Sequence, residues 1–134
     1  MSDARTALAT LRQAADDGSL DPIMERNGVR VFGAFGSATL AGDHTPSDLD
    51  VGVQFKDRLK VLELLDELTE LTRYDRIDLT VIDGEHPVSD AEAMTGFPLY
   101  EAEPGAYATL QMAALAHRRD TEWLRLLDLQ RMAE

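Results

Sequence analysis

The chain has 134 residues and a net charge of −12 at pH 7, from 25 acidic and 13 basic side chains, and it contains no cysteine. This length predicts one domain that is large enough to bury a hydrophobic core. The acidic balance argues against direct nucleic-acid binding, and the missing thiols exclude disulfides and zinc–thiolate sites. The sequence shows neither a signal-peptide pattern nor an apolar run near the roughly 20 residues of a membrane span, so a cytoplasmic protein is expected.

The first third of the chain predicts two helices followed by a strand. A helix is expected over residues 3–16, and a short helix that ends at Arg26 follows, with Asp21 at its N-cap. Val29–Ala34 is rich in β-branched and aromatic residues and predicts a strand. Residues 35–41 should then form a turn and a short helix.

The middle of the chain predicts a strand–helix–strand unit. A loop over 42–47 leads to a strand at Leu49–Phe55. Residues 57–73 have the clearest helical pattern, because leucines at helical spacing form a wide apolar stripe beside a charged face. Ile77–Ile82 predicts a third strand, which ends at Asp83–Gly84.

The last part of the chain is predicted to be mainly helical. Ser89 and the glutamate three residues after it resemble a capping box for a short helix to Met94. Phe97–Glu101 should be a short extended segment, and two helices are expected at 104–117 and 121–132. Strands that alternate with helices indicate an α/β or α+β domain with a small sheet.

The stretch 36–50 carries the clearest chemical signal. Gly36–Ser37 closes the first predicted strand, and Asp48 and Asp50 open the second. Residues two apart on a strand point to the same side, so both carboxylates should face one direction. Oxygen ligands of this kind suit Mg²⁺ shared with substrate phosphates, and a small-residue turn offers backbone N–H groups to phosphates. The stretch predicts metal-assisted chemistry on a nucleoside triphosphate; the alternative is ordinary turn chemistry.

Asp78 is the third candidate carboxylate. It interrupts the third predicted strand on the side opposite to Ile77, Leu79 and Val81, the side that it shares with Thr80 and Ile82. An unpaired carboxylate is costly to bury among such residues. Because it follows Asp50 by one strand–helix–strand unit, it is interpreted as a third metal ligand or a general base. The alternatives are a solvated strand end or a structural partner for Arg73 or Arg76.

Other sequence features point away from competing chemistry. No Gly-Lys-Ser/Thr sequence is present, which excludes a Walker A loop. His44, His86 and His117 lie far apart in the chain, so they are expected to be surface residues rather than metal ligands. Trp123 and the leucines around it are expected to pack in the core, or alternatively to belong to a partner interface.

These motifs together resemble a known family. The runs Val31–Ser37 and Ser47–Val53, followed by Ile77–Leu79, resemble the signature of the DNA polymerase β-like nucleotidyltransferase superfamily. The small size resembles the minimal nucleotidyltransferase (MNT) branch, in which a segment similar to Phe97–Glu101 follows the third strand. The resemblance covers residues 28–101.

The resemblance implies a fold and a domain organisation. The fold would be an α/β (α+β) nucleotidyltransferase fold, with a small mixed β-sheet flanked by helices. Residues 1–134 would form one minimal nucleotidyltransferase domain, with its core at 28–101 and carboxy-terminal helices within 104–132.

The resemblance also implies site residues and cofactors. Asp48, Asp50 and Asp78 would be the catalytic residues and would hold two Mg²⁺ ions, which bind the triphosphate and lower the pKa of the attacking hydroxyl. Asp78 would assist deprotonation of the acceptor. Gly36 and Ser37 would bind the phosphates of ATP, so that pyrophosphate can leave in line.

Members of this branch are often antitoxins paired with HEPN-domain ribonuclease toxins, and as a class they transfer AMP from ATP to a tyrosine of the toxin. The chain lacks the Arg-x4–6-His signature of the HEPN partner, so the resemblance implies the antitoxin half of a HEPN/MNT pair, in a homo- or hetero-oligomer. Its acidic charge would suit a basic ribonuclease.

One feature departs from the family pattern. Family members often carry arginines soon after the Gly-Ser pair, whereas residues 38–42 contain no basic side chain. Two alternatives therefore stay open beside protein adenylylation. The chain could neutralise its partner as a non-catalytic binding module, or it could transfer nucleotides to a small molecule or an RNA.

Overall fold

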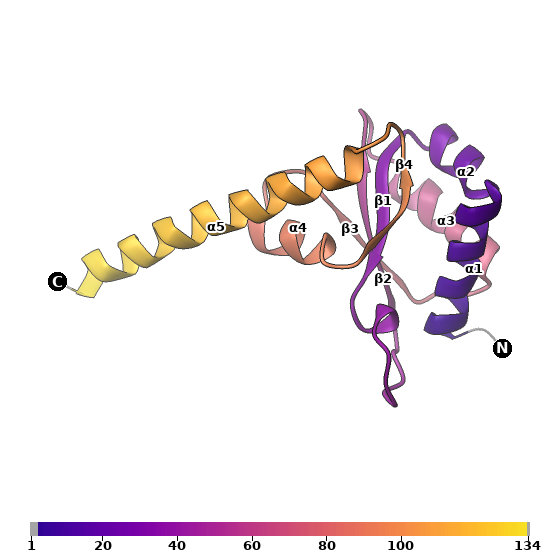
Figure 1. The fold of residues 1–134 in the computed structure, drawn as a ribbon, viewed down its shortest axis with the longest axis horizontal. Helices are drawn as coiled ribbons and strands as arrows, with labels where there is room; N and C mark the ends of the chain where they lie inside the picture. Colours follow the sequence, from indigo (N-terminus) through magenta and orange to yellow (C-terminus); the bar gives the residue numbers. More distant parts are fainter. Residues whose placement is uncertain (1–2, 134) are drawn as a thin grey trace.

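A four-stranded mixed β-sheet forms the centre of the computed structural model, which describes residues 3–133 (Figure 1). Its strands are β1 (Val29–Phe35), β2 (Leu49–Phe55), β3 (Ile77–Val81) and β4 (Phe97–Glu101). They lie in the order β3-β2-β1-β4. β1 is antiparallel to β2 and β4, whereas β2 and β3 are parallel, as a helical crossover between them requires.

Helices cover both faces of this sheet (Figure 1). Within residues 3–133 they are α1 (Ala4–Asp17), α2 (Leu20–Arg26), the 3₁₀ turn η1 (Ser37–Thr39), α3 (Val61–Thr72), α4 (Pro87–Ala93) and α5 (Ala106–Ala133). Helices α1, α2 and α3 lie on one side of the sheet, and α4 and α5 lie on the other. The mixed α+β fold predicted from the sequence is confirmed. None of the helices in the described range has the length and apolar character needed to cross a membrane.

The larger hydrophobic cluster lies between the sheet and α1, α2 and α3. Its fully buried members include Leu11, Leu20, Met24, Phe32, Leu64 and Leu68. Full burial of each such side chain contributes about 1.5–3 kcal/mol, so this face supplies most of the driving force for folding. The amino-terminal end of α1 is fixed by Asp3, which accepts a hydrogen bond from the Thr6 amide at 2.8 Å.

The smaller cluster lies under α4 and α5. It contains Val31, Phe35, Ile82, Ala93, Met94, Tyr107 and Ala114. Because it is smaller, it leaves the end of this sheet face at β2 and β3 free of apolar cover. The polar residues of those two strands therefore lie at the margin of a core and not inside it.

The strands agree closely with the sequence predictions, while several helix ends differ. The strands at Leu49–Phe55 and Phe97–Glu101 match their predicted ranges. The prediction that Asp21 caps α2 is wrong: the helix begins at Leu20, so Asp21 lies in its first turn. α3 begins at Val61 and not at residue 57, because 57–60 form the connection from β2.

The predicted capping box at Ser89 is also wrong. α4 begins at Pro87, whose fixed φ fits a first helical turn, and Ser89 lies inside the helix. The two helices predicted in the last 30 residues are one continuous helix, α5. No glycine or proline interrupts it after Gly105, and Thr121 donates its hydroxyl to the His117 carbonyl at 2.8 Å, within the helix.

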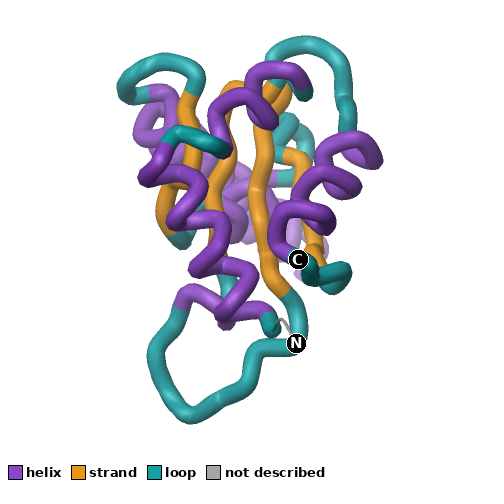
Figure 2. The backbone as a smooth tube through the Cα atoms, turned by 90° about the vertical axis from the view of Figure 1, so that its right-hand side faces the viewer, coloured by secondary structure: helices purple, strands orange, loops and turns teal. Residues whose placement is uncertain are grey.

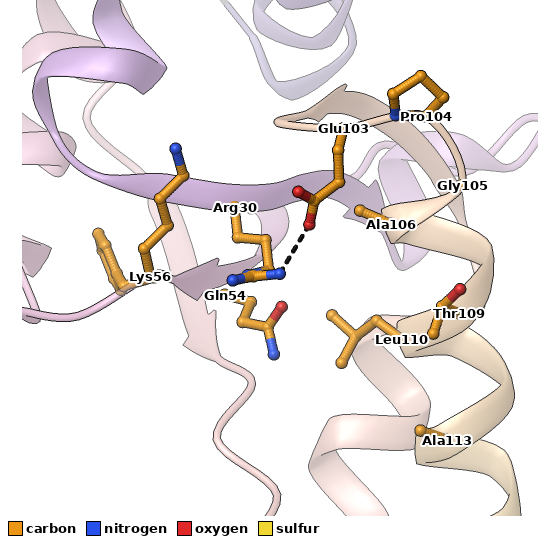
Figure 3. Close-up of a pocket in the computed structure, with 11 residues that line it drawn as sticks. Arg30, Gln54, Lys56, Glu103, Pro104, Gly105, Ala106, Thr109, Leu110 and Ala113 are labelled. Carbon is orange, nitrogen blue, oxygen red and sulfur yellow. Dashed lines mark hydrogen bonds and ion pairs between the residues drawn. The ribbon is translucent and has the colours of Figure 1, made fainter.

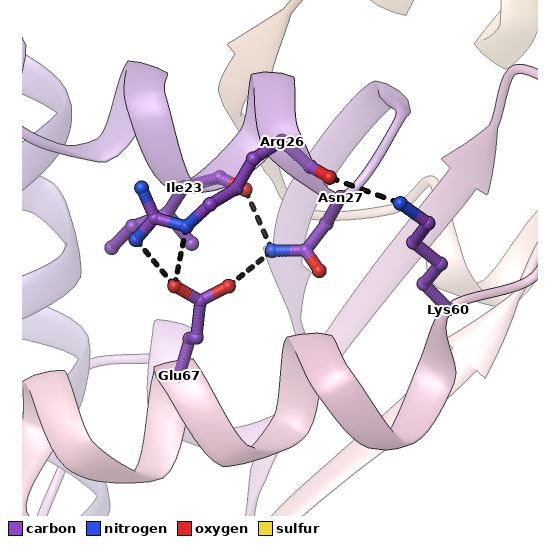
Figure 4. A network of polar contacts seen from close by, with 5 residues as sticks. All are labelled: Ile23, Arg26, Asn27, Lys60 and Glu67. Carbon is purple, nitrogen blue, oxygen red and sulfur yellow. Dashed lines mark hydrogen bonds and ion pairs between the residues drawn. The ribbon is translucent and has the colours of Figure 1, made fainter.

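A polar network ties α2 to α3 (Figure 4). Glu67 of α3 accepts hydrogen bonds from Arg26 and from the amide of Asn27, which is only 3% exposed. The same Asn27 amide donates to the Ile23 carbonyl at 2.8 Å, and Lys60 donates to the Arg26 carbonyl at 3.2 Å. Glu67 therefore accepts the second hydrogen bond of a buried side-chain amide, whose first hydrogen bond goes to the Ile23 carbonyl.

Replacing Glu67 with alanine should destabilise the fold by about 1–3 kcal/mol, because one N–H of the buried Asn27 side-chain amide loses its acceptor. The hydrogen bond from Arg26 holds the pKa of Glu67 below its usual range. The stability that Glu67 contributes is therefore present above the ordinary pKa of glutamate and is lost as the pH falls through the folded value. Urea denaturation measures both effects. Glu70→Ala, an exposed change on the same helix, should stay within about 0.5 kcal/mol; equal losses in both variants would contradict this assignment.

Candidate active site

Two of the predicted carboxylates lie side by side on neighbouring strands. Phe35 of β1 is paired with Asp50 of β2, and Asp50 is paired with Asp78 of β3. Residues paired in this way point to the same face of the sheet. Phe35 belongs to the cluster under α4 and α5, so both carboxylates lie on that face. Neighbouring strands are about 4.8 Å apart, which brings the two acids close together at one end of the sheet.

Asp50 lies in a strongly negative environment. Burial raises the pKa of Asp50 above its usual range, and the charges of Asp78, Asp48 and Glu92 raise it further. Glu92 projects from α4, and its sequence pattern indicates only a helix-capping role; its approach to Asp50 depends on how α4 packs. Three carboxylates therefore act on Asp50 from three different elements, and such a concentration of negative charge favours a bound cation.

Asp48 lies near Asp50 and Asp78, but its side chain forms an ion pair with an arginine. Its carboxylate lies 3.6 Å from the Arg76 guanidinium, and both side chains are at least half exposed. Arg76, considered as a structural partner for Asp78, is instead ion-paired with Asp48. Within residues 3–133, no three acidic or histidine side chains stand close enough to hold a metal ion as they are. Exposed ion pairs are worth about 0–1 kcal/mol, so a cation could draw Asp48 away from Arg76 at little cost.

Gly36 places the backbone of the turn directly against Asp50. Its φ of 79° and ψ of −164° lie in a region that only glycine adopts readily. A Cβ atom at this position would collide with the Asp50 carboxylate. The turn is closed by Thr39, whose hydroxyl donates to the Gly36 carbonyl at 2.6 Å. Ser37 follows as the first residue of η1 and is exposed. The structure therefore brings the predicted phosphate-binding turn and the acidic pair together.

A cation from α1 holds the loop that follows this turn. The Arg5 guanidinium donates to the carbonyl oxygens of Leu40 at 3.3 Å and Gly42 at 3.2 Å. It also lies 3.3 Å from Nε2 of His44, and the same ring nitrogen is 2.9 Å from the Ser37 carbonyl oxygen. Figure 2 shows this loop extending beyond the end of the sheet, beside the start of α1. The loop after Gly36 has no arginine of its own, and Arg5, which is distant in the sequence, holds it in place.

No pattern in the sequence signals this role of Arg5. It lies in the first turn of α1, far from Gly36 in the chain, and only the packing of α1 across the sheet brings it to the loop. His44 is exposed, as expected from the sequence. At the other end of the loop, the Tyr74 hydroxyl donates to the Ser47 carbonyl, so both ends of the loop are fixed by side chains from outside it.

A separate pocket of about 520 Å³ lies at the opposite end of the sheet (Figure 3). It is lined by the start of α5 and by Arg30, Gln54 and Lys56, and Arg30 forms an ion pair with Glu103 at 2.7 Å. The Glu101 carboxylate already accepts hydrogen bonds from the amides of Gly105, just before α5, and Tyr107, in its first turn. None of the five predicted site residues lines this pocket, so it is not part of the candidate active site.

Asp50→Asn should stabilise the protein at neutral pH by roughly 0.5–2 kcal/mol, because it removes a charge that burial and three carboxylates disfavour. A raised folded pKa means that the native state binds the proton more tightly than the unfolded chain. The contribution of Asp50 to the free energy of unfolding is therefore at its most favourable below the ordinary pKa of aspartate. It is lost as the pH rises through the folded pKa, because the carboxyl group then becomes charged. Urea titrations from acid to neutral pH should show the variant gaining over wild type as the pH rises. Asp66→Asn, an exposed change on α3, should show no such trend, and a loss of stability at neutral pH in the Asp50→Asn variant would contradict the prediction.

Arg5→Ala should loosen the loop without unfolding the domain. We expect amide hydrogen exchange in residues 37–44 to accelerate by roughly fivefold, which corresponds to about 1 kcal/mol of lost hydrogen bonding. Exchange in α3 should stay unchanged, which would separate local loosening from global destabilisation. Arg58→Ala serves as the control, because Arg58 is an exposed arginine outside this loop. Unchanged exchange in the loop of the Arg5 variant would refute a holding role.

No known family model and no curated protein matches the sequence. Solved structures do match the fold. A toxin–antitoxin structure with AMP-PNP is 17% identical, with a TM-score of 0.66 over 89% of this chain and 99% of that chain. A structure of tri-AMPylated Shewanella oneidensis HEPN toxin in complex with MNT antitoxin is 15% identical, with a TM-score of 0.63 over 92% and 99%. A mutant MntA–HepT structure, in which two aspartates two positions apart are replaced by glutamate, is 15% identical, with a TM-score of 0.66 over 88% and 98%. At these identities the likeness establishes the fold alone, which this chain shares with these toxin–antitoxin structures.

Proposed function

We propose that the chain is an antitoxin-type nucleotidyltransferase, which transfers AMP from ATP to a protein partner. The partner would be a HEPN-type ribonuclease toxin, and the modified group would be the hydroxyl of a tyrosine. The observation that carries the proposal is the pairing of Asp50 with Asp78 on adjacent strands, directly beside the Gly36 turn. An acidic pair and a glycine turn with a strained backbone thus lie together at one end of the sheet.

The structural relatives support this reading. One of them holds AMP-PNP, an ATP analogue, and another contains an AMPylated toxin. The two substituted aspartates of a third are two positions apart, which is the spacing of Asp48 and Asp50. The fold, the spacing of the acids and the chemistry of the site agree on nucleotidyl transfer as the reaction.

Some residues of the site would bind cations, and others would bind the phosphates of ATP. Asp48, Asp50 and Asp78 would hold two Mg²⁺ ions, since carboxylate oxygens are the ligands that this ion prefers. Bound there, Mg²⁺ would neutralise charge on the phosphoryl oxygens and lower the pKa of the attacking hydroxyl. Amides of the Gly36–Ser37 turn would bind the β- and γ-phosphates. Arg5 and its contacts would keep that turn in place.

The reaction proposed for this site is an in-line displacement. The tyrosine oxygen of the partner would form a bond to the α-phosphorus of ATP while the bond from that phosphorus to the bridging oxygen of pyrophosphate breaks. Asp78, the more exposed acid of the pair, would accept the tyrosine proton. The products would be an AMP–tyrosine phosphodiester on the partner and free pyrophosphate.

A second candidate function is neutralisation of the partner by binding alone. The ion pair between Asp48 and Arg76 favours it, because this contact occupies one of the three acids that catalysis would need. The net charge of −12 suits a basic partner under either reading. The two functions differ in whether the partner is chemically changed.

Incubation with α-labelled ATP, Mg²⁺ and the product of the neighbouring gene separates these two functions. Wild-type protein should transfer label to a tyrosine of the partner. Asp50→Asn and Asp78→Asn should each lower the rate on the order of 100-fold or more, because each removes a candidate metal ligand. Omission of Mg²⁺ should abolish transfer.

Two results would decide against transfer to a protein. A stable complex that carries no label, and that forms equally well with Asp50→Asn, would establish neutralisation by binding alone. Label found on RNA or on a small molecule, but not on the partner, would identify a different acceptor. Asp66→Asn is the matched control and should retain full transfer, since Asp66 is an exposed aspartate on α3, outside the acidic site.

A further inference from the structure

The distal part of α5 extends away from the rest of the molecule (Figure 1). Tyr107 and Ala114 are the buried residues of this helix, and no residue from 115 to 133 is buried. Large apolar side chains are nevertheless exposed along it: Met112, Leu115, Trp123, Leu124, Leu126, Leu129 and Met132. A run of exposed apolar residues of this length marks an interaction surface.

Eight exposed residues of α5 form a continuous stripe, which we call the α5 seam. Alternating steps of four and three residues place them on one side of a helix, as the a and d positions of a coiled coil. The seam residues are Ala108, Met112, Leu115, Arg119, Glu122, Leu126, Leu129 and Ala133. The two charged members occupy its centre, and the other six are apolar. At 1.5 Å per residue the seam is about 38 Å long.

A different side of the helix, about a quarter turn from the seam, faces the body of its own chain. Arg118 and Arg125 line a groove with Glu85 and His86 at the start of α4. Tyr107 and Ala114 lie on that same side, whereas all eight seam residues are exposed. The seam also contains none of the predicted site residues, so a protein bound to it would leave the acidic edge of the sheet accessible.

We infer that a second copy of this chain covers the seam, with the two α5 helices antiparallel. When two seams are aligned in opposite directions, apolar residues face apolar residues and each charged residue faces one of opposite charge. Arg119 of each copy then faces Glu122 of the other, and Leu115 faces Leu126. The same register places Met112 opposite Leu129, and the alanines at the two ends opposite each other.

The central charges fix both the orientation and the register. An in-register parallel pair would set Arg119 against Arg119 and Glu122 against Glu122, which like-charge repulsion disfavours. The antiparallel pair forms two Arg–Glu contacts, and a polar pair within an apolar seam is a known means of specifying register. The two bodies then lie at opposite ends of the paired helices. This inference does not depend on the proposed function.

Charge exchange within the seam tests the pairing. Sedimentation of the full chain should show a concentration-dependent dimer. Arg119→Glu alone and Glu122→Arg alone should each weaken it by about 100-fold, because like charges then meet at the centre. The double variant with both changes should restore the dimer. Leu124→Asp is the matched control, an equally exposed leucine outside the seam, and it should leave the dimer intact.

Cysteine cross-linking tests the register, since the natural chain has no cysteine. The variant Leu115→Cys/Leu126→Cys should oxidise to a covalent dimer. The two positions are about 16 Å apart along one helix, so a disulfide within one chain is excluded. Leu126→Cys alone should remain uncross-linked.

Three results would overturn the inference: a monomer at all concentrations, a dimer that is indifferent to the charge reversals, or efficient cross-linking by Leu126→Cys alone. Monomeric protein whose complex with the neighbouring gene product is lost on Leu126→Asp would assign the seam to that partner instead. A failure of nucleotidyl transfer would leave every one of these measurements unaffected.

Discussion

Repulsion between carboxylates at one edge of the sheet is the constraint around which this molecule is organised. Asp50 is partly buried and close to three other acids, an arrangement that opposes folding. The surrounding structure has to hold it in place. The large cluster under α1, α2 and α3 provides that stability on one face, while the smaller cluster under α4 and α5 leaves the acids at its margin. Repulsion between these carboxylates destabilises the protein without a ligand. A positively charged ligand would relieve that repulsion, so the site is well suited to bind one.

The strands and the acidic pair could be predicted from the sequence because both depend on local pattern. Period-two alternation fixes which residues of a strand share a face, and the unit from Asp50 to Asp78 has the length of a single helical crossover. Helix ends were less predictable. Asp21 and Ser89 have the chemistry of caps, but the chain enters each helix before it reaches them, because tertiary packing and Pro87 decide where helical dihedrals begin.

Contacts between distant segments were beyond sequence reasoning. Arg5 and Glu92 reach the site only through the packing of α1 and α4; Arg5 carries no motif, and the pattern around Glu92 indicates helix capping and not a site role. The metal-ligand and phosphate-binding roles of the five site residues remain predictions. The structure does show that Asp50, Asp78 and Gly36 are neighbours, while Asp48 faces Arg76. Trp123, for which the sequence left core packing and a partner interface open, is 62% exposed on the projecting helix.

The parallel pairing of β2 with β3 has a consequence for the order in which the site forms. Gly36 directly follows β1, and Asp50 lies on the adjacent antiparallel strand β2, so the two can meet early, whereas Asp78 joins them only after α3 has crossed the sheet. Pairings between distant segments form slowly, because the chain entropy of the intervening loop is lost before the contact is made. Asp78 therefore joins Asp50 late in folding, and the negative charge of Asp50 opposes its approach. A nascent chain that has not yet reached β3 holds a turn and one carboxylate of the pair, so the complete acidic pair exists only on a finished fold.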